Sequence, residues 1–211
     1  KMVNKFHINK NEFLSKNITG YYHQLYTGYK QQDNPDFLNI LKNTFGTEEL
    51  NNLTAAWNND IDILTSDIPK IIRDTDISNY MCICVPRAKA LNTYSNSQLM
   101  FKDAVKVAIS AIYGVSDGTN CIIRIRDTLT THLRRATNDG RISGNYGAEP
   151  YPGITKDTCQ INTSRIKGQN IILIDDIYTK NVNVDEDCIQ ALFDNEAKSV
   201  IFYAIGYTRR K

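Results

Sequence analysis

The segment that decides the fold is residues 171–183, with the sequence IILIDDIYTKNVN. Its first four residues are uninterrupted Ile and Leu, a pattern typical of a parallel strand covered by helices on both faces. Two acids, Asp175 and Asp176, follow directly, and their charges cannot both be buried in a core without partners. They are therefore predicted to face a site at the carboxyl end of the strand, the edge where open α/β sheets bind ligands.

Other β-rich apolar runs lie at residues 80–85, 121–125 and 199–205. Apolar residues recur with helical spacing over residues 101–112, between the first two of these runs. The same spacing over residues 184–192 separates the 170–174 strand from the last run. Strands that alternate with helices predict an α/β fold with a parallel sheet. Cys82 and Cys84 alternate along the first strand and are expected to be small core residues.

The first 79 residues are predicted to be helical. One apolar stripe at helical spacing consists of Leu14, Ile18, Tyr21 and Leu25. A second helix is expected after Asn34-Pro35, a third from Thr47, and a short fourth beginning at Pro69. The predicted organisation is a helical N-terminal extension or cap (1–79) followed by an α/β domain (80–211). Within the latter, the glycine-rich residues 138–168 are expected to form a lid or loop.

Composition excludes several classes of protein. No apolar run approaches the roughly 18 residues of a membrane helix, and residues 1–10 lack the apolar stretch of a secretory signal. The five cysteines form no CxxC pair, so neither a disulfide framework nor a zinc site is indicated. We expect a reducing, cytoplasmic environment and no membrane partner.

Charge is concentrated in the middle of the chain. Residues 80–168 carry 12 basic and 6 acidic side chains, whereas the whole chain has a net charge of only +2. Five of the basic residues fall within 18 positions: Arg124, Arg126, Arg134, Arg135 and Arg141. This block indicates a polyanionic partner, either a phosphorylated small molecule or a nucleic acid, with a solvated basic surface as an equal alternative.

The residues after the strand also suit an anionic ligand. A loop that leads into a helix N-terminus offers backbone N–H groups and a positive dipole end to a phosphate. An acidic pair beside it suits a magnesium ion, bound directly or through water, or the hydroxyls of a ribose. The alternative is a strand-end turn with solvated acids.

These residues resemble the phosphoribosyl-binding motif of type I phosphoribosyltransferases: an apolar strand, two acids, two variable residues, Thr-Thr-Gly, a small residue and Thr. The resemblance covers residues 80–207, and the nearest branch is ComF-like, or orphan amidophosphoribosyltransferase-like. There a strand ending in Val-Pro precedes a helix, as Val85-Pro86 does here, and an Arg-rich segment precedes the motif. The fold implied is a Rossmann-like parallel sheet of the type I phosphoribosyltransferase kind, with an N-terminal α-helical extension.

The resemblance also implies roles for individual residues. Asp175 and Asp176 would be the catalytic pair, contacting the ribose hydroxyls of phosphoribosyl pyrophosphate (PRPP), with Mg²⁺ bridging hydroxyls and pyrophosphate. The loop around the 5-phosphate would comprise Thr179, Lys180, Asn181, Val182 and Asn183. The pyrophosphate loop would comprise Arg87, Ala88 and Lys89, and the cationic lid Arg126, Arg134, Arg135 and Arg141. The reaction would be glycosyl transfer or N-glycosidic cleavage, catalysed by positioning and by neutralising the departing pyrophosphate.

The motif departs from the family pattern, since Lys180, Asn181 and Asn183 stand where Thr, Gly and Thr are usual. Asn181 tolerates left-handed dihedral angles, so the turn is expected to form. A non-catalytic PRPP or nucleotide sensor is therefore an alternative. Another is an effector of a bacterial antiviral defence module that acts with a nucleic-acid-bearing partner. An aromatic helical face of Tyr21, Tyr22, Tyr26 and Tyr29 is expected to serve packing or a partner, in a homo-oligomer or a complex.

Overall fold

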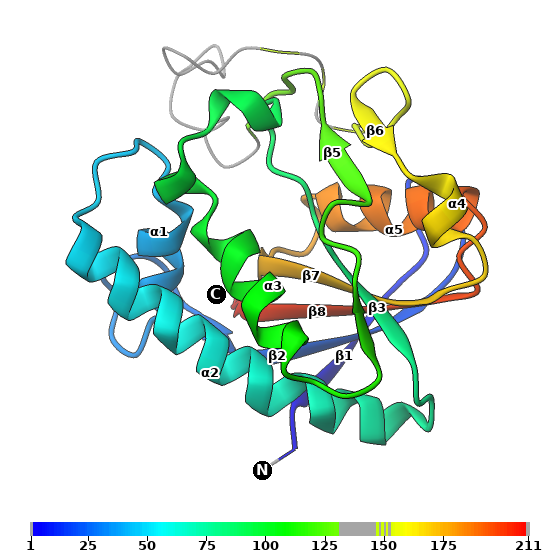
Figure 1. The fold of residues 1–211 in the computed structure, drawn as a ribbon, viewed down its shortest axis with the longest axis horizontal. Coiled ribbons are helices and arrows are strands. Elements are labelled where there is room, and N and C mark those ends of the chain that lie inside the picture. The colour runs from blue at the N-terminus through cyan, green and yellow to red at the C-terminus, as the bar shows by residue number, and fades with distance from the viewer. Residues whose placement is uncertain (1, 131–146, 148, 150, 152, 210–211) are drawn as a thin grey trace.

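A central sheet of six strands organises the molecule. The computed structural model describes residues 2–130, 147, 149, 151 and 153–209. The strand order is β1-β2-β8-β7-β3-β4, in which β1 is antiparallel to β2 and every other neighbouring pair is parallel. The strands are β1 (Asn4–Ile8), β2 (Ile18–Tyr26), β3 (Tyr80–Cys84), β4 (Val115–Asp117), β7 (Asn170–Tyr178) and β8 (Ser199–Thr208). The fold is thus α/β with a mixed, largely parallel sheet (Figure 1).

Different elements cover the two faces of this sheet. The helices α2 (Leu50–Thr75) and α3 (Met100–Ser110) pack on one face, together with the short α1 (Phe37–Lys42). The helix α5 (Val184–Asp194) packs on the other face. A small antiparallel pair, β5 (Ile122–Arg124) with β6 (Cys159–Ile161), and α4 (Thr163–Ile166) extend that second layer. Two 3-10 turns, η1 (Leu91–Thr93) and η2 (Asn96–Gln98), lead into α3.

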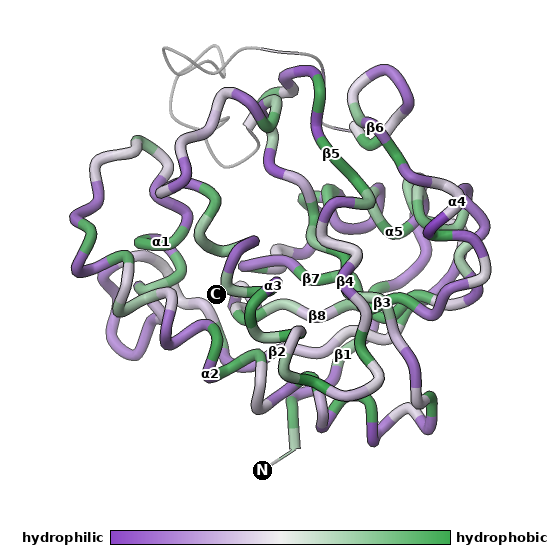
Figure 2. Tube along the Cα trace, in the orientation of Figure 1, coloured by the Kyte–Doolittle hydropathy of each residue, from purple (hydrophilic) through white to green (hydrophobic). Residues whose placement is uncertain are grey.

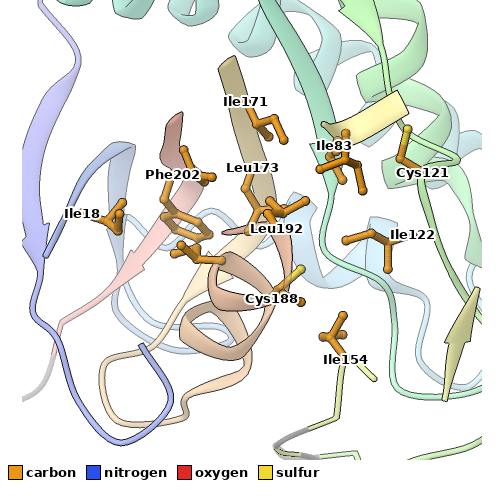
Figure 3. Packing of buried hydrophobic residues seen from close by; sticks show 14 of the residues in the cluster. Ile18, Ile83, Cys121, Ile122, Ile154, Ile171, Leu173, Cys188, Leu192 and Phe202 are labelled. Atoms are coloured by element: carbon orange, nitrogen blue, oxygen red, sulfur yellow. The ribbon is translucent and has the colours of Figure 1, made fainter. Parts of the chain in front are cut away.

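The β7 strand is buried on both sides, as its sequence predicts. Ile171, Ile172, Leu173 and Ile174 are each 0 % exposed. Ile171 and Leu173 face α5, where Leu192 and Cys188 meet them (Figure 3), and Ile172 and Ile174 belong to the cluster under α2 and α3. Figure 2 shows the same apolar character along β3 and β7. Full burial of each such side chain stabilises the fold by roughly 1.5–3 kcal/mol, so this strand anchors both layers.

The predicted helix over residues 14–25 is wrong, and with it the all-helical extension. Residues 18–26 form β2, which pairs with β8 on one side and with β1 on the other. The β-branched and aromatic residues of this segment favour a strand, and the Tyr21 side chain packs in the core cluster between the sheet and α2. The tyrosines expected on a helical face lie instead on β2 and the loop after it. The N-terminal segment thus contributes to the central sheet.

Three further expectations are corrected. Pro69 lies inside α2 and does not begin a fourth helix. The predicted strand at 121–125 does form, but β5 pairs with β6 outside the central sheet, and β4 takes the position beside β3. Part of the predicted 138–168 lid is regular structure, since β6 and α4 lie within it. Residues 138–146, 148, 150 and 152 lie outside the described residues.

Candidate functional site

The acidic pair lies at a point where the connections of the sheet diverge. From β3 the chain passes through α3 to β4, which lies on one side of the β7–β3 pair. From β7 it passes through α5 to β8, which lies on the other side. Pairing between β3 and β7 ends at Cys84 and Ile174, with a last hydrogen bond from Val85 N to Ile174 O of 2.9 Å. Asp175 and Asp176 follow immediately on β7. Neighbouring strands whose connections diverge form the crevice where open α/β sheets bind ligands.

Asp176 forms an ion pair with a residue from the N-terminal segment. The Lys42 Nζ atom, at the end of α1, lies 3.0 Å from Asp176 Oδ2, and the two side chains are 26 % and 14 % exposed. Burial opposes the charged form of Lys42, but the carboxylates of Asp176 and Asp175 outweigh it, so its pKa is raised. A charged ammonium therefore lies at the acidic pair.

Asp175 has a different partner, Asp185 in the first turn of α5. A hydrogen bond between the two carboxyl groups lowers the pKa of Asp175 and raises that of Asp185, so Asp185 is the group that carries the proton and donates it. Burial, followed by the charge of Asp176, raises the pKa of Asp175 to about 7. Burial and Asp175 also raise the pKa of Asp185 well above its usual value. The two adjacent acids thus have different partners, the Lys42 ammonium for Asp176 and the Asp185 carboxyl for Asp175.

The turn that resembles a phosphate loop forms as expected. Asn181 and Asn183 have φ of 69° and 65°, so both adopt the left-handed conformation that a glycine would favour. Asn183 is the N-cap residue of α5 but makes no capping hydrogen bond, because its Oδ1 accepts from Asn11 Nδ2 at 3.0 Å. The hydroxyl oxygens of Thr179 and Thr208 are hydrogen-bonded at 2.7 Å, and the Lys180 side chain is exposed. The asparagines therefore preserve the turn without the glycine.

The other two acids of the first turn of α5 point into the protein. Glu186 accepts a hydrogen bond from the Tyr178 hydroxyl at 2.9 Å. Asp187 Oδ2 accepts the backbone N–H groups of Gly153 and Ile154 at 2.6 and 3.0 Å. Burial raises the pKa of both carboxyls. Their inward direction reduces the repulsion they would exert on an anion bound at the turn.

The predicted pyrophosphate loop lies at the same edge, but its cations are engaged with the backbone. Arg87 Nη1 donates to the carbonyls of Lys42, at 2.7 Å, and Gln98, and its guanidinium lies 4.4 Å from the Tyr94 ring centroid. Lys89 Nζ donates to the Thr128 carbonyl at 3.0 Å. Thr128 N in turn donates to Ala88 O at 2.8 Å. These contacts tie β3 to α1 and to the β5 end.

Of the predicted lid cations, Arg126 is exposed after β5. Arg134, Arg135 and Arg141 lie outside the described residues. Arg124, part of the same basic block, is buried: its Nη1 donates to the Gly153 carbonyl and its Nε to the Arg87 carbonyl at 3.2 Å. Part of the basic block thus serves the architecture rather than a partner.

Sequence reasoning missed Lys42 and one further acid, Asp60 of α2. Asp60 is 0 % exposed, and neither of its carboxyl oxygens has a hydrogen-bond partner among the described residues. Burial raises its pKa well above the usual value, and Asp176 adds to the effect. The sequence signal for Asp60 is its spacing along α2, because Asp60 and Asp67 occupy positions on the helix face that is otherwise apolar and buried. Nothing in the sequence places Lys42 beside residues more than 130 positions away.

The arrangement does not fit a divalent cation held directly by the acidic pair. Magnesium binds ionised carboxylate oxygens with open coordination positions. Here Asp176 is paired with an ammonium and Asp175 accepts a hydrogen bond from Asp185. In the described part of the chain, no three His, Cys, Asp or Glu side chains are arranged to hold a metal.

Comparison with known proteins adds no family assignment, because no family model and no curated protein matches the chain. Within the described ranges, no helix is both long enough and apolar enough to span a bilayer. The longest helix, α2, has 26 residues and buries the carboxyl groups Asp60 and Asp67. The function must be argued from the geometry of the β7 edge.

Proposed function

We propose that this chain is a phosphoribosyltransferase-like protein that binds a 5-phosphorylated ribose, as PRPP or a nucleotide, at the carboxyl end of β7. The observation that supports it is the position of the acidic pair at the divergence of β3 and β7, two residues before the end of β7 and the left-handed turn into α5. Acids suit sugar hydroxyls, and a turn at a helix N-terminus suits a phosphate. The ribose hydroxyls would then contact the acids, and the 5-phosphate would contact the turn.

The reaction proposed is transfer of the phosphoribosyl group or cleavage of an N-glycosidic bond. The chain's own contribution would be to orient the sugar between the acids and the turn, because positioning lowers the barrier to an oxocarbenium-like transition state. Mg²⁺ would arrive bound to the pyrophosphate and hydroxyl oxygens of the ligand rather than to the acidic pair. This accords with the partners that Asp175 and Asp176 already have.

One observation favours a non-catalytic sensor as the second candidate. Arg87, Lys89 and Arg124 donate to backbone carbonyls. Catalysis requires cations directed at the departing pyrophosphate. A protein that binds the sugar phosphate without turning it over needs no such cations, and the same acids and turn would suffice.

Calorimetry with PRPP, ribose 5-phosphate and nucleotides tests the binding site. The intact chain is expected to bind at least one of them, and Asp175→Asn or Asp176→Asn to weaken binding about tenfold or more, the equivalent of roughly 1.4 kcal/mol. Asp62→Asn, an exposed acid on α2, is the matched control and should leave affinity unchanged. Absence of binding by the intact chain to all three ligands would refute the proposal.

A second measurement separates the two candidates. Pyrophosphate release from PRPP, with a panel of nitrogenous bases and amines as acceptors, identifies a transferase. Binding of PRPP with no pyrophosphate formed over a long incubation identifies a sensor.

A further inference from the structure

Lys42 is held in place by contacts on both its side chain and its backbone. Its ammonium lies 3.0 Å from Asp176 Oδ2, and its carbonyl oxygen accepts from Arg87 Nη1 at 2.7 Å. The next residue, Asn43, ends α1 in a left-handed conformation and donates through Nδ2 to Ser97 at 3.3 Å. Because the backbone is fixed from the loop after β3, the ammonium is directed to the acidic pair rather than free to sample solvent.

The surroundings of this ion pair are strongly acidic. Asp60 of α2, completely buried and without a hydrogen-bond partner in the described part of the chain, is close enough to Asp176 for that charge to raise its pKa. Asp185 lies on the other side, against Asp175, and its Oδ1 is likewise unpartnered among the described residues. Lys42 is therefore a positive charge beside Asp176 and Asp175, two acids that themselves have further carboxyl groups from α2 and α5 as neighbours.

We propose that the Lys42 ammonium takes, at Asp176, the place of a protein-bound divalent cation, so that ribose 5-phosphate binds at this edge without a metal. The sugar-binding half of this inference rests on the proposed function; the exclusion of the metal by Lys42 does not. An ammonium has three N–H donors, and Asp176 Oδ2 accepts one of them. The others suit the hydroxyl oxygens of a pentose, which a divalent cation would otherwise coordinate.

Manganese titration, followed by the electron paramagnetic resonance of free Mn²⁺, tests the exclusion directly. Mn²⁺ prefers the same carboxylate oxygens as Mg²⁺. The intact chain is expected to bind Mn²⁺ weakly, and Lys42→Met to bind it roughly tenfold or more tightly, since a repelling charge about 3 Å from Asp176 is gone. Lys42→Met combined with Asp176→Asn should lose the gained affinity. Lys42→Arg keeps the charge and should bind Mn²⁺ as weakly as the intact chain.

A matched control removes a lysine from an ion pair elsewhere. Lys167→Met breaks the exposed pair with Glu196, whose Nζ and Oε2 atoms are 2.6 Å apart, and should not change Mn²⁺ binding. Two results would overturn the exclusion. One is Mn²⁺ binding by the intact chain that Asp176→Asn removes. The other is a Lys42→Met variant, folded by circular dichroism, that binds Mn²⁺ no more tightly than the intact chain.

The second arm uses ribose 5-phosphate, which has no pyrophosphate to carry Mg²⁺ into the site. Its affinity for the intact chain should agree within about twofold in EDTA and in excess Mg²⁺, and fall roughly tenfold in Lys42→Met but not in Lys42→Arg. Binding that requires Mg²⁺ would overturn the inference. If the intact chain binds neither this sugar nor PRPP nor any nucleotide, the proposed function fails, while the Mn²⁺ titration still decides the role of Lys42.

Discussion

The raised pKa values of Asp175 and Asp185 make stability depend on pH in an unusual direction. The pKa of Asp175 is raised from 3.8 to about 7, so the folded chain binds more protons than the unfolded chain between these values. Stability therefore falls as pH rises through this range, because ionising the buried pair opposes folding. A shift of about three units at about 1.4 kcal/mol per unit gives roughly 4 kcal/mol, an upper bound for a coupled pair.

Asp185→Asn is the perturbation that isolates the contribution of Asp185. It removes a carboxyl whose pKa burial and Asp175 raise well above the usual value, whereas burial and Asp176 still raise the pKa of Asp175. In urea unfolding at a series of pH values from 4.5 to 8, the intact chain should lose roughly 2–4 kcal/mol of unfolding free energy as pH rises. Asp185→Asn should lose at least about 2 kcal/mol less over the same range.

The informative quantity is the difference in pH slope between the intact chain and Asp185→Asn, rather than either slope alone. Burial also raises the pKa of Asp60, Glu186 and Asp187, which add to the slope of both proteins and cancel in the comparison. Asp62→Asn serves as control, since this exposed acid should leave the slope unchanged. Equal slopes in the intact chain and in Asp185→Asn would refute the raised pKa of Asp185.

Three further predictions concern the scaffold of the site, and urea unfolding checks each one. Leu173→Ala should cost about 2–5 kcal/mol, because this 0 % exposed side chain packs between β7 and α5. Asn181→Gly should change the unfolding free energy by less than about 1 kcal/mol, whereas Asn181→Val, β-branched at a φ of 69°, should cost roughly 1–2 kcal/mol. Gly20→Ala should cost about 1–3 kcal/mol, because a Cβ there would lie 2.5 Å from the Phe6 ring; a neutral effect would contradict the β1–β2 register.

The sequence predicts the elements best where burial and local preference agree. The apolar run of β7 and the helical stripes of α3 and α5 were all identified, because burial on both faces or on one helical face leaves a clear period. β2 was missed because its apolar residues also match helical spacing, and only its β-branched and aromatic content distinguishes the two. β4 has only three residues and is too short to leave a period.

The site could be predicted only in part, for a reason of topology. The strand-end acids and the left-handed turn are local features, and the sequence places both correctly along β7. Lys42 and Asp60 precede β7 by more than 100 positions, and no local pattern records which side chains their helices bring to it. The sequence predicts Arg87 and Lys89 in a pyrophosphate loop, and it does not show that nearby carbonyl oxygens accept hydrogen bonds from both side chains.

These long-range partners change what the acidic motif can do. Two ionised carboxylates at a strand end would attract a divalent cation and repel a phosphate bound to the adjacent turn. With an ammonium at Asp176 and a hydrogen bond from Asp185 to Asp175, the edge carries less negative charge than its sequence suggests. In the proposed function, a phosphate at residues 179–183 would then meet the positive end of α5, while the acidic pair would keep oxygens that can accept from hydroxyls. The partners from α1 and α5 would therefore let one short segment serve both ends of the proposed sugar phosphate.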